Sequence, residues 1–105
     1  MSSTLVIDPS MAKFEAKASE AASLMKALAN EKRLMILCKL LEHGEMSVLP
    51  LSEQVGLSQS ALSQHLAKMR EEQIVGFRRD AQTLYYRVAD KSVIQILSIL
   101  KQAFC

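Results

Sequence analysis

Two cysteines, Cys38 and Cys105, carry the most nucleophilic side chains of this sequence. A thiolate attacks sulfane sulfur, and a second thiol can then close a disulfide or polysulfide bridge. Two thiols can also hold a soft metal ion such as Cu(I) or As(III). A cysteine in an apolar segment is also a common small core residue, and Cys38 lies beside Leu34 and Leu41 at helical spacing. The residues alone leave these three interpretations open.

A second set of residues has side chains suited to DNA. Residues 59–72 predict a helix whose inner face holds Leu62, Leu66 and Met69, while its other face carries serine, glutamine and lysine. Serine and glutamine address base edges, the free N–H groups at a helix start suit a phosphate, and arginines on a hairpin reach the flanking backbone. We interpret His65 as a packing or phosphate-contacting residue and not as a metal ligand. The predicted DNA contacts are Ser58, Gln59, Ser60, Ser63, Gln64, His65, Lys68, Arg78, Arg79 and Gln82.

Composition narrows the possible partners of the 105-residue chain. It is 50% hydrophobic and 23% charged, with a formal net charge of only +2, as in an ordinary globular protein. Aromatic residues make up 5% and tryptophan is absent, which disfavours stacking on single-stranded nucleic acid. Basic residues are nevertheless concentrated locally, because Ser58 to Val88 holds five Lys or Arg against three Asp or Glu, a balance of +2.

The elements that position these residues follow from hydrophobic periodicity and turn signals. Residues 1–9 read as a mobile arm, and residues 10–105 as one domain. The expected order is a helix from Ser10, a helix over 31–43, a short helix capped by Ser47, a turn at 56–58, the helix over 59–72, a hairpin over 74–88 and a last helix after Asp90. The predicted fold is mainly α with a small β-hairpin wing, a winged helix-turn-helix.

The first and last helices each present an apolar stripe, and the helices between them cannot cover both. Pairing of two chains across a two-fold axis is the simplest way to bury these stripes, so we expect a homodimer. The alternative is a monomer that folds both helices back on its own core. We expect a cytoplasmic protein without a secretory signal or membrane segment, with reduced thiols and no enzymatic activity, since no catalytic set of residues is visible.

Three blocks resemble the ArsR/SmtB family of bacterial repressors: residues 24–34 (LMKALANEKRL), residues 57–66 (LSQSALSQHL) and Tyr85-Tyr86-Arg87. The resemblance covers roughly residues 12 to 105. It implies a dimeric winged-helix repressor that binds double-stranded operator DNA, with dimer contacts from the first and last helices.

The metal sites known in that family find no match here. The positions of its Cys-x-Cys pair fall on Ser47 and Leu49. Its zinc site in the last helix keeps Asp90, but Ser92 and Ala103 stand where histidines would be. Zinc wants about four ligands, so we expect no metal and no cofactor.

The cysteines resemble those of the BigR/SqrR/YgaV/HlyU dithiol group within the family. That resemblance implies that Cys38 and Cys105 respond to persulfides or other reactive sulfur species, forming a disulfide or polysulfide that weakens DNA binding. Other interpretations are a regulator with inert thiols that displaces a nucleoid protein, as in HlyU-like derepressors, a Cu(I) or As(III) sensor, and a winged-helix module that binds proteins and not DNA.

Overall fold

The chain is described by a computed structural model over residues 9–104, in two compact units that meet in sequence between Asn30 and Glu31. Of the predicted arm at residues 1–9, only Pro9 is among the described residues, where it begins a helix. Cys105 also lies outside the described residues.

The first unit contains two short helices, α1 (Pro9–Ala16) and α2 (Ala18–Leu28). The sequence predicted one continuous helix here, but the structure breaks it at Lys17, which has φ −109° and ψ 13°. The N–H of Lys17 donates to the carbonyls of both Lys13 and Phe14, so α1 ends in a tightened turn. In the predicted apolar stripe, Phe14 and Met25 are 57% and 55% exposed.

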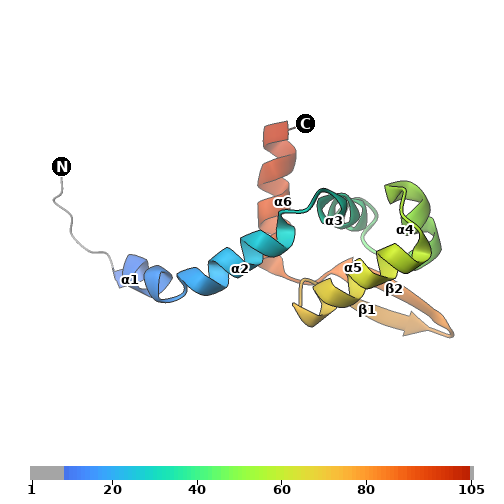
Figure 1. Cartoon of the computed structure of the whole chain (residues 1–105), viewed down its shortest axis with the longest axis horizontal. Helices are drawn as coiled ribbons and strands as arrows, with labels where there is room; N and C mark the ends of the chain where they lie inside the picture. Colours follow the sequence, from blue (N-terminus) through green and yellow to red (C-terminus); the bar gives the residue numbers. More distant parts are fainter. Residues whose placement is uncertain (1–8, 105) are drawn as a thin grey trace. The chain divides into compact units, whose positions relative to one another are not determined.

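The second unit is a helical body with a hairpin. Its elements are α3 (Glu31–His43), α4 (Val48–Val55), α5 (Gln59–Glu71), β1 (Val75–Asp80), β2 (Thr83–Val88) and α6 (Lys91–Phe104) (Figure 1). The mainly helical winged fold predicted from the sequence is confirmed. Branched and long apolar side chains from every helix fill its core, with less than 2% exposure at Ile36, Leu37, Leu40, Leu51, Val55, Leu62, Leu66, Met69, Ile74 and Val93.

Strands β1 and β2 pair antiparallel, from Val75 opposite Val88 to Asp80 opposite Thr83. The connection is therefore a two-residue turn, and its first residue, Ala81, has φ 57°. Left-handed backbone at this position matches the right-handed twist of a hairpin. In the loop before α4, Met46 exchanges two backbone hydrogen bonds with Tyr86 of β2, which fixes the base of the hairpin to the helical body.

Three predicted helix starts are found at their expected positions. Ser58 caps α5, because its hydroxyl accepts from the N–H of Ala61 at 3.1 Å. Asp90 caps α6 by accepting from the N–H groups of Ser92 and Val93 at 2.8 and 3.2 Å. Ser47 stands at the N-cap of α4, but its side chain forms no capping bond.

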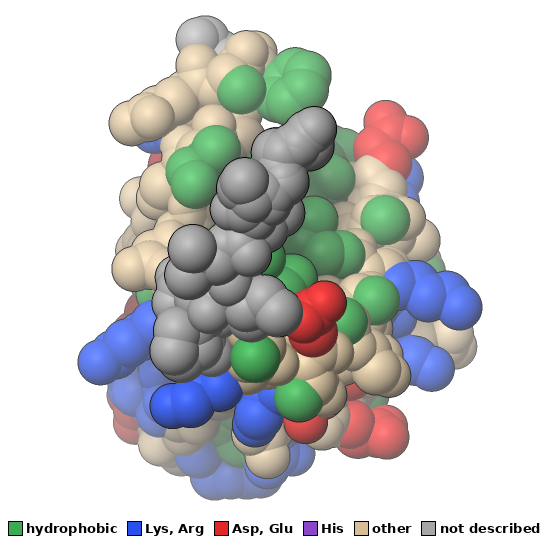
Figure 2. All heavy atoms as spheres, turned by 90° about the vertical axis from the view of Figure 1, so that its left-hand side faces the viewer, with side chains coloured by type: hydrophobic (Ala, Val, Ile, Leu, Met, Phe, Trp, Pro, Cys, Tyr) green, Lys and Arg blue, Asp and Glu red, His purple; other side chains and the backbone are tan. Residues whose placement is uncertain are grey.

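No helix in residues 9–104 is long and apolar enough to cross a membrane. In the view of Figure 2, apolar side chains stand on the surface near the upper end, where α6 ends.

Candidate nucleic-acid interface and thiol site

Helix α5 has one face in the core and one in solvent. Leu62, Leu66 and Met69 are fully buried, which fixes the rotation of the helix about its axis. The opposite face is consequently exposed, with Ala67 as a small residue between polar ones. The exposed polar residues include the predicted contacts Gln59, Ser60, Ser63, Gln64 and Lys68. Such a face can approach base edges without disturbing the core.

The turn between α4 and α5 sets the angle between the two helices. Gly56 ends α4 in the left-handed region, with φ 68°, and its N–H donates to the carbonyl of Ser52. Glycine adopts this conformation without the penalty that a Cβ atom brings. The N-cap residue Ser58 follows and is exposed. The start of α5 thus lies at the surface, and the N-terminus of a helix favours a phosphate.

His65 is half-buried on the same helix. Burial lowers its pKa, and the positive charge of Arg33 lowers it further, so the neutral imidazole is favoured. The packing or phosphate-contacting role of His65 stays a prediction, since a half-buried side chain is compatible with either. Within residues 9–104, no three His, Cys, Asp or Glu side chains are grouped in a way that would hold a metal ion.

The predicted DNA contacts of the hairpin differ in their distance from the turn and in their partners. Arg79 and Gln82 are exposed near the turn, as expected. Arg78 lies further from the tip than expected, opposite Tyr85. Its guanidinium donates two hydrogen bonds to the carboxylate of Glu45 and lies 4.5 Å from the centre of the Tyr85 ring.

Arg78 and Glu45 carry opposite charges and shift each other's pKa. The hydrogen bond and charge of Arg78 hold the pKa of Glu45 below its usual range, and Glu45 raises that of Arg78 in turn. Sequence reasoning missed Glu45 because nothing in a loop residue signals a partner on a distant strand.

A ring contact joins the hairpin to the end of α5. The guanidinium of Arg70 lies 4.1 Å from the centre of the Phe77 ring, a cation–π distance. Phe77 in turn packs edge-on against Tyr86, with ring centres 5.4 Å apart. Arg70 therefore has a structural contact in addition to its charge.

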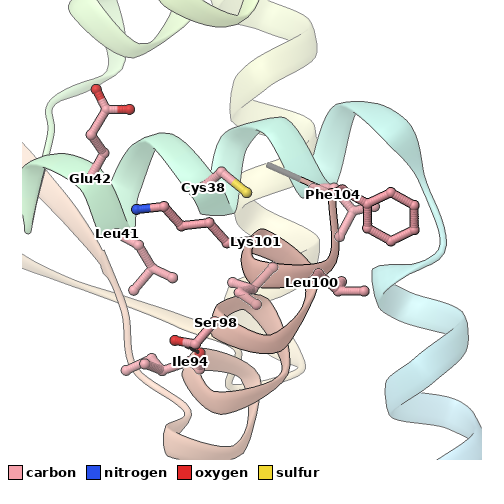
Figure 3. A pocket seen from close by; sticks show the side chains of 10 residues that line it. Cys38, Leu41, Glu42, Ile94, Ser98, Leu100, Lys101 and Phe104 are labelled. Atoms are coloured by element: carbon pink, nitrogen blue, oxygen red, sulfur yellow. Dashed lines mark hydrogen bonds between the residues drawn. The ribbon is translucent and has the colours of Figure 1, made fainter.

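The thiol of Cys38 is exposed, although α3 contributes much of the core. The side chain lines a hollow between α3 and α6, and in Figure 3 its sulfur points toward the last turn of α6. Cys38 is therefore not a buried core residue, while the reactivity of its thiol stays a prediction. Its predicted partner Cys105 is outside the described residues, but the preceding residue, Phe104, lines the same hollow.

A helix-turn-helix followed by a β-hairpin wing, with a polar outward face on the second helix of the motif, defines the winged-helix DNA-binding proteins. Residues 30–76 match the family model described as "Bacterial regulatory protein, arsR family". The chain is 45% identical to the transcriptional activator HlyU of Vibrio cholerae serotype O1, over 87% of this chain and 83% of that protein. It is 42% identical to the transcriptional regulator YgaV of Escherichia coli K12, over 90% of this chain and 96% of that protein.

Solved structures agree with this assignment. The crystal structure of the transcriptional repressor BigR from Xylella fastidiosa superposes with a TM-score of 0.82, at 39% identity, covering 90% of this chain and 96% of that one. The chain belongs to the arsR family of bacterial transcriptional regulators, as its sequence blocks predicted.

Proposed function

We propose that the chain is a repressor that binds a double-stranded DNA operator as a homodimer, with α5 in the major groove and the hairpin against the flanking backbone. The proposal rests on the two faces of α5, one buried and one exposed. Its inner residues are fully buried, whereas the serines, glutamines and lysine of its outer face are exposed. Side chains of these types form hydrogen bonds with base edges and phosphates.

Exposed apolar side chains support the homodimer. In the second unit, Ile99 and Phe104 on α6 are 65% and 83% exposed. In the first unit, Met11 and Phe14 on α1 are 54% and 57% exposed. Burying such side chains against a second copy removes their apolar surface from water, at about 25 cal/mol for each Å². A two-fold symmetric pair would do so with the same surfaces on both chains.

The effector we propose is a reactive sulfur species that acts on Cys38 and Cys105. The Cys38 thiolate attacks a sulfane sulfur of a polysulfide, and the remaining sulfur chain leaves as the anion. The resulting Cys38 persulfide is then attacked by the Cys105 thiolate, which displaces hydrosulfide and leaves a disulfide. Both thiols are oxidised, and the sulfane sulfur is reduced to sulfide. Exposure of Cys38 and the position of Phe104 in the same hollow support this assignment.

Fluorescence anisotropy with DNA from upstream of the gene tests the proposal. Reduced protein, polysulfide-treated protein and treated Cys38→Ser protein are titrated at fixed salt concentration, since phosphate contacts make affinity salt-dependent. We expect treatment to weaken binding by the wild type and to leave Cys38→Ser unchanged. Mass spectrometry then counts the sulfur atoms in the bridge.

A different result would contradict each part of the proposal. Equal affinity before and after treatment would show inert thiols, while DNA binding would stand. Absence of salt-dependent DNA affinity in the reduced protein would instead favour a protein-binding module. Release of DNA by Cu(I) or As(III), without any response to polysulfide, would identify a soft-metal sensor.

A further inference from the structure

The hollow beside Cys38 is large and mostly apolar. Its volume is about 760 Å³, which is in the range of pockets that hold small organic molecules. Its walls come from α3 on one side and α6 on the other (Figure 3). The lining residues are Leu34, Cys38, Leu41, Glu42, Ile94, Leu97, Ser98, Leu100, Lys101 and Phe104.

The two charged residues of the lining, Glu42 and Lys101, differ in their ion pairs. Glu42 is engaged on its own helix, 3.4 Å from the ammonium of Lys39 and 3.6 Å from His43. In Figure 3 its carboxylate points away from the hollow. In Figure 3 the side chain of Lys101 extends from α6 toward α3, and it forms no ion pair with residues 9–104. Among residues 9–104 the ammonium group of Lys101 has no ion-pair partner, and an apolar wall with such a group is complementary to a molecule with an apolar body and one negative charge.

From this complementarity we propose that the hollow binds a small amphipathic organic anion. Its apolar part packs against leucine and isoleucine side chains of α3 and α6, and its anionic group pairs with Lys101. An inorganic anion would gain nothing from the apolar walls, and a neutral hydrocarbon would gain nothing from the ammonium.

Occupancy of the hollow would cover the thiol of Cys38, because that side chain is part of the wall. The bound anion therefore controls how fast external reagents reach the sulfur. Binding itself does not depend on the proposed thiol switch. Only its consequence for DNA release does.

Decanoate is a suitable probe, since it joins a flexible apolar chain to one carboxylate. The full chain, labelled with ¹⁵N, is titrated with decanoate, and the shifts of amide signals are followed by NMR. In parallel, the alkylation of Cys38 by iodoacetamide is timed, and peptide mass spectrometry separates Cys38 from Cys105. Decylammonium, with the same chain length and the opposite charge, is the matched ligand control.

We expect shifts concentrated on the facing sides of α3 and α6. At a decanoate concentration nine times the dissociation constant, alkylation of Cys38 should slow by about tenfold, because about nine-tenths of the hollows are then occupied. Lys101→Glu should weaken decanoate binding by about fivefold or more, since an exposed ion pair is lost and a repulsive charge is added. Lys91→Glu changes the same charge at the exposed start of α6, outside the hollow, and should leave binding unchanged.

Two results would overturn the proposal. One is an absence of shifts and of protection by decanoate, as expected if a second copy of the chain fills the hollow. The other is equal binding of decylammonium and decanoate, or equal effects of the two lysine variants, which would leave an apolar surface without anion selectivity. Neither result bears on whether polysulfide releases DNA, so the thiol switch is tested separately.

Discussion

The guanidinium of Arg78 on β1 is paired with the carboxylate of Glu45, 33 residues earlier in the loop between α3 and α4. Both side chains are partly exposed, at 52% and 38%. The pair therefore fixes a basic residue of the hairpin while partly cancelling its charge. A DNA phosphate that approached Arg78 would have to compete with Glu45.

Replacing Glu45 with glutamine should strengthen DNA binding. The change keeps the size of the side chain, removes its charge and leaves Arg78 available to a phosphate. We expect higher affinity at low salt and a steeper dependence of log K on log salt, by up to about one unit for each chain, as for one added phosphate contact. Anisotropy titrations at several salt concentrations measure the slope. Glu15→Gln, which removes the same charge from exposed α1, is the control and should leave the slope unchanged.

Gln64→Ala should reduce the preference for operator DNA without affecting the fold. Gln64 is exposed on α5, so its loss should change the free energy of unfolding by less than about 0.5 kcal/mol. If it reads a base, specific affinity should fall by about 1–3 kcal/mol while non-specific affinity stays the same. Gln95 is exposed on α6, so Gln95→Ala is the control that removes the same side chain outside α5. Equal losses on specific and random DNA would assign Gln64 to backbone contact only.

Ala81→Gly should stabilise the protein. Ala81 has φ 57°, a left-handed conformation that costs an L-residue about 1–2 kcal/mol. Glycine adopts this conformation without that cost, but it also has more freedom in the unfolded chain, so only part of the cost is recovered as stability. We expect a gain of about 0.5–1 kcal/mol in urea denaturation. Gln82, the next residue in the turn, is not among the positive-φ residues of the described chain, so Gln82→Gly should give no gain. A loss of stability in Ala81→Gly would contradict the turn geometry.

Stability should depend on the protonation of His65. Burial and Arg33 lower the pKa of His65 in the folded protein below its ordinary value of about 6.5. The unfolded chain therefore takes up a proton first as the pH falls, and stability is lost from about pH 7 downward through 6.5. His65→Gln should flatten the dependence of the urea midpoint on pH in this window. His43→Gln on the exposed end of α3 is the control, and an unchanged slope in His65→Gln would refute the assignment.

Elements with a strong local signal could be predicted from the sequence. Helix α3 has its predicted bounds, because Gly44 ends it with φ 84°. The caps by Ser58 and Asp90 are local hydrogen bonds between residues at most three positions apart, so the sequence determines them directly. The buried face of α5 follows from the spacing of its leucines.

Features that depend on distant residues could not be predicted. The break at Lys17 interrupts a segment whose apolar period continues without change, so periodicity alone gives no signal. The pairing of Glu45 with Arg78 joins a loop to a strand through side chains only. The exposure of Cys38 could not be predicted either, because Leu34 and Leu41, its neighbours at helical spacing, are apolar. Only the path of α6 leaves a hollow beside Cys38.

The division of α5 into a buried and an exposed face also concerns how such regulators diverge. The core residues Leu62, Leu66 and Met69 cannot change without a large loss of stability, whereas exposed residues such as Ser63 and Gln64 change at little cost. Substitutions that alter the DNA sequence read by the proposed outer face would thus leave the scaffold intact. After gene duplication, two copies of such a chain could acquire separate sets of target genes while keeping one architecture.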